Sequence, residues 1–166
     1  MRKAIKYLLL VSIILVSNYC YSADLTTAQK KFQTELMNFL KEEGFAPYID
    51  TDDNSVCFKK EGELHWIIIS NESPFFIVFR RVGFSLEGEN ALNLISSLLA
   101  CNEVNKEEAA VKMYCTDKSV LLGVESFTRS IEDFKYVFYS SLKVLNSAND
   151  TFITKYREFE DNDKKE

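Results

Sequence analysis

The sequence predicts an α+β fold, ordered as a helix, an antiparallel strand meander, a second helix, a β-hairpin and a C-terminal helix. In three segments the apolar residues recur at spacings of three and four, which is the period of an amphipathic helix. The runs between those segments are rich in β-branched and aromatic residues and are broken by Gly, Pro, Asn and Asp, as strands and turns are. Groups of strands flanked by helices indicate an antiparallel α+β sheet, whereas parallel sheets alternate strand and helix one by one.

The chain begins with the three parts of a secretory signal peptide, in residues 1–22. Basic residues precede the apolar run 8–16, and a small residue stands just before Ala23, where we expect cleavage. The apolar run is shorter than the roughly twenty residues that span a bilayer. We therefore expect an exported protein, periplasmic or extracellular, with no membrane insertion after the signal is removed. Lipidation at Cys20 is a minor alternative, because bulky Tyr19 precedes it.

The charge balance argues against polyanionic partners. Removal of residues 1–22 leaves 17 basic and 25 acidic residues, a formal net charge of −8. Nucleic acid and anionic membrane surfaces both require a basic face, so we expect neither as a partner. The mature chain is long enough for one domain with its own core. We place that single α+β domain at residues 23–159.

The first helix is predicted from Thr26 to Gly44. Thr26 and Gln29 form a capping-box pattern at its start, and Gly44 supplies the left-handed residue that ends a helix. Its apolar stripe consists of Phe32, Leu36, Phe39 and Leu40. The strand meander then occupies residues 46–81, with turns expected at 52–54, 61–62 and 71–74.

Two strands of the meander, residues 64–69 and 75–79, are apolar on both faces. Such strands are normally covered on both sides. If the three helices pack on one side of the sheet, the other side exposes a larger apolar patch than soluble monomers usually show. We therefore expect a protein or peptide partner, or a second copy of the chain in a homodimer, to bind there. The partner-binding residues would be Trp66, Ile68, Phe76 and Val78.

The second half of the chain predicts a helix, a hairpin and a further helix. The buried stripe of the second helix is expected to consist of Leu92, Ile95, Leu98, Leu99 and Asn102. The hairpin strands follow at 110–115 and 120–127, and a capping box at 130–133 opens the third helix. Its stripe consists of Ile131, Phe134, Phe138, Leu142 and Leu145. A shorter helical run near 152–159 and a disordered charged tail, 160–166, are expected to complete the chain.

Asn102 and Asn105 stand where the second helix gives way to the hairpin. Asparagine is favoured at helix ends, because its side chain bonds nearby backbone groups and tolerates left-handed backbone angles. The last carbonyls of a helix have no partner within it, and an asparagine amide can satisfy one of them. We therefore interpret the pair as a helix stop and not as a catalytic site.

The element order, the segment Asn102-Glu-Val-Asn105 and Lys112 on the following strand resemble the YbjN family, and the fold that this family shares with type III secretion chaperones. The resemblance covers residues 25–160 in element order and 88–127 in residue pattern. It implies a small binding or chaperone-like domain that is commonly dimeric, and it supplies no catalytic residues. The predicted signal peptide departs from the cytoplasmic secretion chaperones.

Few residues are suited to catalysis. His65 is the only histidine, and no nucleophile motif stands beside it. Cys57, Cys101 and Cys115 lack the Cys-x-x-Cys spacing of redox sites, and with one histidine they do not indicate a zinc site. Residues 50–54 lack the glycine and the distal glutamate of a calcium loop, so a solvated β-turn is expected there. We predict no catalytic, cofactor-binding or metal-binding residues.

The spacing also predicts no intramolecular disulfide. Cys101 lies about one turn from the expected helix end, whereas Cys115 lies some five residues into the returning strand. At rises of about 1.5 and 3.3 Å per residue, these depths are about 6 and 17 Å. A disulfide needs closer α-carbons than that offset allows.

These observations predict an exported, non-catalytic binding or chaperone-like module that recognises a protein or peptide. Two alternatives stay open. One is a small extracytoplasmic enzyme that uses His65 or a cysteine, and the other is a carrier of an apolar small molecule. Substitution of His65 and of the cysteines distinguishes the enzyme, because a binding module keeps its partner without them.

Overall fold

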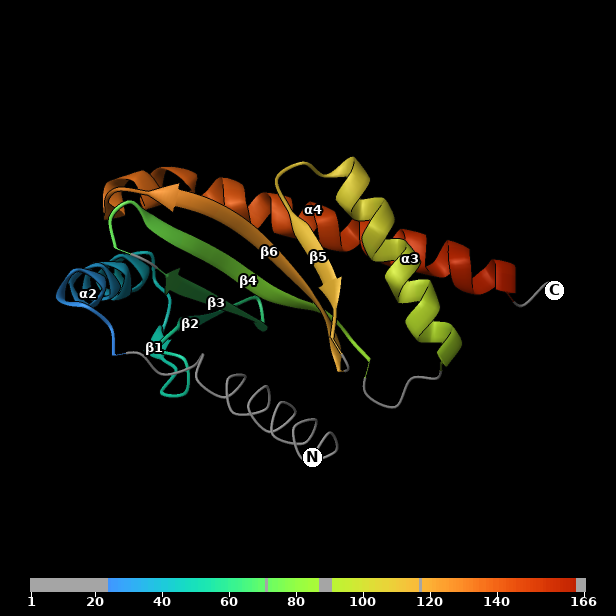
Figure 1. Ribbon diagram of the computed structural model, residues 1–166, viewed down its shortest axis with the longest axis horizontal. Coiled ribbons are helices and arrows are strands. Elements are labelled where there is room, and N and C mark those ends of the chain that lie inside the picture. Colours follow the sequence, from blue (N-terminus) through green and yellow to red (C-terminus); the bar gives the residue numbers. More distant parts are fainter. Residues whose placement is uncertain (1–23, 71, 87–90, 117, 164–166) are drawn as a thin grey trace, which may run out of the picture.

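The computed structural model describes residues 24–70, 72–86, 91–116 and 118–163 (Figure 1). Residues 1–22, the predicted signal peptide, lie outside the described residues. The described part contains the helices α2 (Thr27–Glu42), α3 (Ala91–Glu107) and α4 (Ile131–Asp163). Its strands are β1 (Tyr48–Ile49), β2 (Val56–Lys60), β3 (Glu63–Ser70), β4 (Phe75–Ser85), β5 (Lys112–Cys115) and β6 (Ser119–Thr128). The predicted α+β class and the predicted order of elements are confirmed.

The strands form one antiparallel sheet in the order β1-β2-β3-β4-β6-β5. The first four strands follow each other as a meander, as the turn residues predict. Gly62 between β2 and β3 has a φ of 90°, which glycine adopts without a steric penalty. The hairpin of β5 and β6 adds to the far edge of the meander, because β6 pairs with β4 over their full length.

The capping box at the start of α2 is confirmed. The Thr26 hydroxyl accepts a hydrogen bond from the Gln29 amide at 3.3 Å, and the Gln29 side-chain oxygen accepts one from the Thr26 amide at 2.9 Å. The Gln29 side chain also donates to the carbonyl of Ile69 at 3.2 Å. The cap therefore ties the first turn of α2 to the end of β3.

The core lies between the helices and one face of the sheet, and aromatic rings fill its centre. Phe79 of β4 stacks on Phe138 of α4, with ring centroids 5.7 Å apart and planes 1° from parallel. Phe39 of α2 meets the edge of the Phe138 ring at 5.1 Å. Phe32 of α2 packs on Phe75 of β4 at 4.6 Å. These contacts place α2 and α4 side by side on the same face of the sheet.

The helix α4 is longer than the sequence predicts. The expected helix, the expected shorter run at 152–159 and residues 160–163 form one continuous helix (Figure 1). The apolar stripe passes without a break through Leu145, Ala148, Phe152 and Tyr156, all of which are buried. Residues 160–163 are therefore helical and not part of a disordered tail, while 164–166 lie outside the described residues.

The buried face of α3 is not the predicted one. Ile95, Leu98 and Leu99 are between 45% and 50% exposed, and Asn102 is exposed. The helix instead buries a stripe of mostly small residues against α4 and β5, formed by Ser96, Ser97, Ala100, Cys101 and Val104. Small side chains let two helices approach closely, so this stripe is the one that faces α4. The side chain of Leu92 lies outside the described part.

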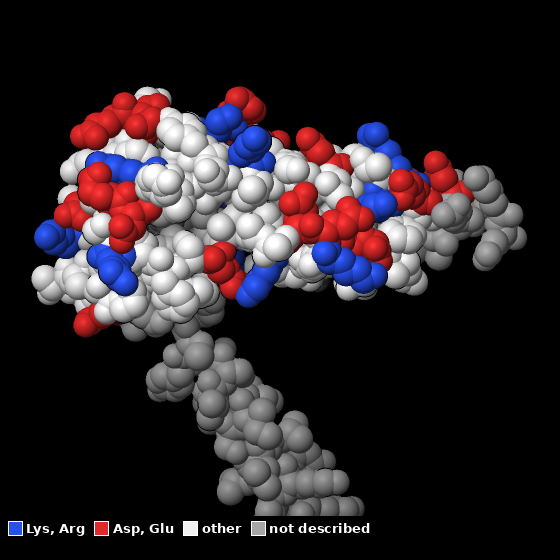
Figure 2. Space-filling model, turned by 90° about the horizontal axis from the view of Figure 1, so that it is seen from above, with Lys and Arg blue, Asp and Glu red and all other residues white. Residues whose placement is uncertain are grey.

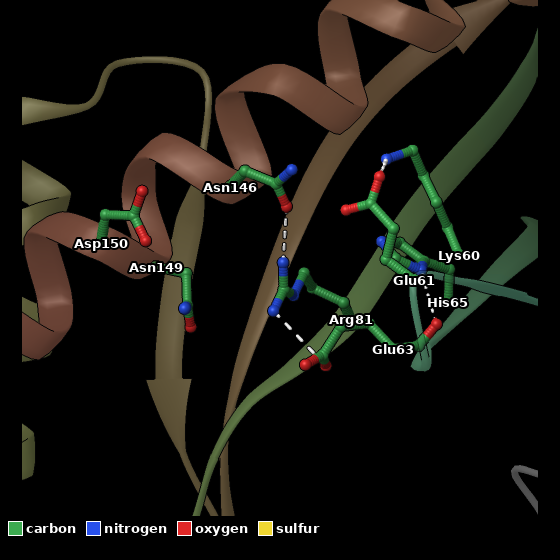
Figure 3. A pocket seen from close by; sticks show the side chains of 8 residues that line it. All are labelled: Lys60, Glu61, Glu63, His65, Arg81, Asn146, Asn149 and Asp150. Atoms are coloured by element: carbon green, nitrogen blue, oxygen red, sulfur yellow. Dashed lines mark hydrogen bonds and ion pairs between the residues drawn. The ribbon is translucent and has the colours of Figure 1, made fainter.

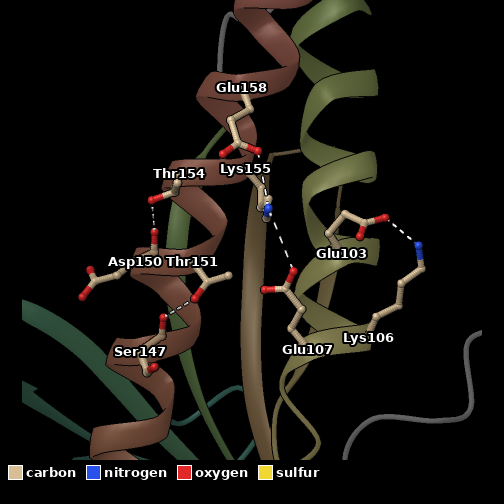
Figure 4. A network of polar contacts seen from close by, with 9 residues as sticks. All are labelled: Glu103, Lys106, Glu107, Ser147, Asp150, Thr151, Thr154, Lys155 and Glu158. Carbon is tan, nitrogen blue, oxygen red and sulfur yellow. Dashed lines mark hydrogen bonds and ion pairs between the residues drawn. The ribbon is translucent and has the colours of Figure 1, made fainter.

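Charged side chains line the seam where α3 runs beside α4 (Figure 4). Lys155 of α4 lies 3.9 Å from the carboxylate of Glu107 on α3 and 3.4 Å from that of Glu158 on its own helix. Lys106 pairs with Glu103 within α3 at 2.6 Å. Exposed pairs of this kind each contribute no more than about 1 kcal/mol, so the buried small residues hold the seam.

Asn105 does not stop α3, which continues for two residues to Glu107. Its side chain instead binds the backbone of β5. The Asn105 amide nitrogen donates to the Met113 carbonyl at 2.9 Å, and its oxygen accepts from the Met113 amide at 2.8 Å. A residue in an antiparallel strand directs both backbone groups to the same side. Asn105 therefore occupies the outward side of β5 at Met113, and we call this contact the Asn105 clamp.

Replacing Asn105 by alanine is expected to destabilise the protein by about 1–3 kcal/mol, because it removes two hydrogen bonds that each contribute about 0.5–1.5 kcal/mol. Asn102→Ala is the matched control, since Asn102 lies exposed one turn earlier on the same helix. The free energy of unfolding of this control variant should stay within about 0.5 kcal/mol of the wild-type value. Urea unfolding of both variants measures the difference. Equal losses in the two variants would contradict a role for the clamp.

Candidate functional site

The four predicted partner-binding residues lie together on the face of the sheet opposite the helices. In β3, Trp66 and Ile68 alternate with core residues, and in β4 Phe76 and Val78 do the same. Ile68 pairs directly with Val78 across the two strands. The side chains shield one another, so Val78 is only 6% exposed and the other three are half-buried. The structure thus brings the four together on one face of the sheet.

Phe127 of β6 extends this surface. It lies opposite Phe76 in the register of β4 and β6, and the two rings are 5.2 Å apart. The Phe127 side chain is 71% exposed, the largest exposure among the aromatic residues of the strands that the structure describes. We call Trp66, Ile68, Phe76, Val78 and Phe127 the outer apolar surface. Phe127 is its most accessible residue.

A hollow of about 480 Å³ lies beside Phe127. It is formed by the end of β6 and the first turns of α4, and its lining residues are Ser126, Phe127, Thr128, Arg129, Glu132, Asp133, Tyr136 and Val137. Tyr136 is also strongly exposed. Phe127 belongs both to the hollow and to the outer apolar surface, so the two are continuous.

The same face becomes polar toward β5. The Arg80 guanidinium lies over the ring of Tyr114, 5.7 Å from its centroid, and Lys112 forms an ion pair with Glu125. These residues follow Trp66 and Ile68 across the register of the sheet. Figure 2 shows the described molecule from above, where basic and acidic side chains are interspersed. On the side seen in that view they form no continuous basic field. Polar groups thus border the outer apolar surface at one end.

The second candidate site is a polar pocket of about 300 Å³ on the helix side of the sheet (Figure 3). The β2–β3 turn, Arg81 of β4 and one turn of α4 form its walls, with the lining residues Lys60, Glu61, Glu63, His65, Arg81, Asn146, Asn149 and Asp150. Arg81 is almost fully buried at its centre. Its guanidinium donates to the Asn146 side-chain oxygen at 2.6 Å and lies 3.4 Å from the Glu63 carboxylate.

Two buried polar atoms of residues that line this pocket have no hydrogen-bond partner, namely Nε2 of His65 and Oδ1 of Asn149, the latter close to Gly83. Nδ1 of His65 lies 3.1 Å from the carbonyl oxygen of Glu63, to which only a protonated nitrogen can donate. Burial lowers the pKa of His65, so the ring is neutral near pH 7 and Nε2 is an acceptor. Both unpartnered atoms therefore accept hydrogen bonds.

The arrangement around His65 does not form a nucleophile–base pair. The ring stacks on Phe58 with centroids 5.2 Å apart, and it is 2% exposed. None of the residues that line the pocket carries a hydroxyl or a thiol, so the pocket walls hold no Ser, Thr, Tyr or Cys for His65 to activate. Within the described residues no group of three or more His, Cys, Asp and Glu side chains is arranged to hold a metal ion.

The thiols are arranged differently from the expectation. Cys101 of α3 and Cys115 of β5 have their sulfur atoms 3.5 Å apart, although both are free. The predicted depth difference was wrong because α3 runs to Glu107 and β5 begins only at Lys112. Cys101 is then six residues from its helix end and Cys115 three residues into its strand, which correspond to about 9 and 10 Å. The side chain of Cys57 lies on the other face of the sheet, beside its cross-strand neighbour Trp66.

Sequence reasoning found the strand residues of the outer apolar surface but missed Phe127 and the whole polar pocket. Phe127 ends an alternating strand, so its outward direction was readable from the pattern. The pocket had no comparable signal, because Arg81 and Asn149 are far apart in the sequence.

None of the helices in the described part of the chain has the length and apolar character that a membrane span requires.

Comparison with known proteins finds no matching family model, no matching curated protein and no matching solved structure. Any functional conclusion therefore depends on the chemistry of the two sites.

The stability of the protein should depend on the protonation of His65. Its pKa is lowered in the folded state, so below the unfolded value of about 6.5 the unfolded chain binds more protons. The wild-type protein should therefore lose stability relative to His65→Gln as the pH falls from about 7.5 to about 5, by at most about 1.4 kcal/mol per pH unit. Urea unfolding across that range measures it. Parallel pH curves would show that His65 already binds protons equally in both states.

Proposed function

We propose that this protein is an exported binding module that recognises a protein or peptide segment rich in aromatic and aliphatic side chains. The observation that carries the proposal is the continuity of the outer apolar surface with the hollow beside Phe127. An apolar sheet face joined to a concave site fits a partner that lies along the sheet and inserts one large side chain at its end. Aromatic residues in such positions dominate binding energy at protein interfaces.

The geometry favours binding through the face of the sheet over addition of a strand to its edge. The edge strand β1 has two residues, which is too short to template a partner strand. At the other edge, the Asn105 clamp occupies the outward backbone groups of Met113. Strand addition needs a row of such groups to be free. The outer apolar surface is therefore the site that we assign to the partner.

The proposal includes the absence of catalysis. His65 is buried between aromatic rings, and its pocket offers no hydroxyl or thiol to activate. The element order that resembles the YbjN family and the secretion chaperones also supports a binding role. The basic and apolar pattern of residues 1–22 supports export, since it has the parts of a secretory signal.

Peptide selection tests the proposal directly. A library of random peptides displayed on phage is selected on the wild-type protein, and the affinities of the selected peptides are measured for variants. Selected peptides should be rich in aromatic and aliphatic residues, and Phe127→Ala should weaken them about tenfold or more. Tyr139→Ala is the matched control, because Tyr139 is an exposed aromatic outside the surface and the hollow. It should leave the affinity within about twofold.

Two results would contradict the assignment. Peptides that bind wild type and Phe127→Ala equally would place the partner site elsewhere. A sedimentation profile that shows a dimer of the wild type, converted to a monomer by Phe127→Ala, would assign the surface to a second copy of the chain.

The polar pocket carries a second candidate function, the binding of a small molecule that donates hydrogen bonds. Its unpartnered acceptors, Nε2 of His65 and Oδ1 of Asn149, are both buried, and buried acceptors without partners are costly. Arg81 pairs with Glu63 and Lys60 pairs with Glu61, so the carboxylate of Asp150 supplies the excess negative charge among the lining residues. A small ammonium compound combines the required donors with the complementary charge.

Ethanolamine is a suitable probe for this pocket, with glycerol as the uncharged comparison. The chain has a single histidine, so the imidazole signals in a nitrogen-correlated NMR spectrum belong to His65 alone. Ethanolamine should shift those signals saturably, and Asn149→Ala should weaken the effect roughly threefold to tenfold. Asn102→Ala should not. Unchanged imidazole signals at high ethanolamine would exclude an ammonium ligand at His65.

A further inference from the structure

The Asn105 clamp sets the register between α3 and β5, and this register places two cysteines opposite each other. Cys101 lies four residues before Asn105, a rise of about 6 Å along the helix. Cys115 lies two residues after Met113, a rise of about 6.6 Å along the strand. The helix and the strand are antiparallel, so a step back along α3 and a step forward along β5 lead to the same side of the clamp. The two rises are nearly equal, which places Cys101 beside Cys115. The two sulfur atoms lie 3.5 Å apart.

We propose that Cys101 and Cys115 are a disulfide-forming pair that links α3 covalently to the edge strand β5 when the protein meets a disulfide oxidant. Both side chains project between the helix and the strand, and bond formation shortens their sulfur–sulfur contact from 3.5 Å to about 2.05 Å. This site is independent of the outer apolar surface, which lies across the sheet.

The two thiols have distinct roles in the reaction. Cys115 is partly exposed, whereas Cys101 is buried. The hydrogen bond between the two sulfurs lowers the pKa of Cys115, while that hydrogen bond and burial raise the pKa of Cys101. Cys115 is therefore both the more accessible sulfur and the one more readily present as a thiolate, which is the form that attacks a disulfide.

With oxidised glutathione as the oxidant, the exchange balances in two steps. The Cys115 thiolate attacks one glutathione sulfur, so a Cys115–glutathione bond forms, the glutathione disulfide breaks, and one glutathione thiolate leaves. Cys101 then loses its proton and attacks the Cys115 sulfur, which forms the Cys101–Cys115 bond and releases the second glutathione. Two protein thiols are oxidised by two electrons, and one glutathione disulfide is reduced to two thiols.

Cys57 provides an internal control. It lies on β2, and its side chain is on the outer face of the sheet beside its cross-strand neighbour Trp66. The sheet therefore separates it from the other two sulfurs. Burial raises its pKa, which makes it a poor nucleophile. We therefore expect Cys57 to stay reduced while the pair is oxidised.

The test equilibrates the reduced, purified protein with oxidised glutathione and traps the remaining thiols by alkylation. Peptide mapping by mass spectrometry without reduction should find the peptides of Cys101 and Cys115 joined, with the loss of two hydrogens, and Cys57 alkylated. Oxidation should also raise the thermal midpoint by roughly 5–10 °C, because the bond closes a short loop of the unfolded chain. Cys57→Ala should form the same bond, and Asn105→Ala should form it more slowly because the register is looser.

A stable glutathione adduct on Cys115 with Cys101 still alkylated would overturn the proposal, since it would show that the two sulfurs do not meet. Alkylation of all three cysteines after equilibration would overturn it as well. Cys115→Ser separates the bond from general oxidation, because it keeps the side-chain size while no cross-linked peptide can form. The midpoint of that variant should not respond to oxidised glutathione.

Discussion

The stacking of Phe79 on Phe138 is the contact around which the molecule is organised. It fixes α4 along the inner face of the sheet, and α4 then supplies a wall for each of the other helices. Phe39 of α2 meets the Phe138 ring, and the small residues of α3 pack against the C-terminal half of α4. Since all three helices share one face, the other face of the sheet carries Trp66 and its neighbours without a helix of the described chain on it. The outer apolar surface is a direct consequence of this one-sided packing.

The sequence predicts the fold class well where a single local signal decides. Alternation in β3 assigns Ile67 to one face and Ile68 to the other, and the capping residues Thr26 and Gln29 locate the start of α2. These signals depend on a few neighbouring residues and on backbone periodicity alone. For the same reason, the residues of the outer apolar surface could be named before the structure, apart from Phe127.

The prediction for α3 failed because two stripes share the helical period. Leu98 and Ile95 belong to the more hydrophobic stripe, whereas Ala100 and Ser97 belong to the smaller one. A hydrophobicity pattern favours the first, but close approach to a long neighbouring helix favours the second, and only the tertiary packing decides between them. The depth of Cys101 was misjudged for a related reason, since a shift of two residues at the helix end changes the alignment with β5 by several ångströms. The polar pocket was invisible to the sequence because its walls come from three distant segments.

Because α3 buries its small residues, its more hydrophobic residues form a second exposed apolar strip, which consists of Leu94, Ile95, Leu98 and Leu99. It lies on the helix side of the sheet, whereas the outer apolar surface lies on the opposite side. One compact partner on the outer surface therefore leaves the α3 strip in contact with water. The Asn105 clamp and the contact between Cys101 and Cys115 hold the C-terminal half of α3 to β5, and the buried Ser96, Ser97 and Ala100 pack the same helix against α4. The helix thus stabilises the fold through one face and presents apolar side chains on another, which separates the face of α3 that stabilises the fold from the face that is free to contact another molecule.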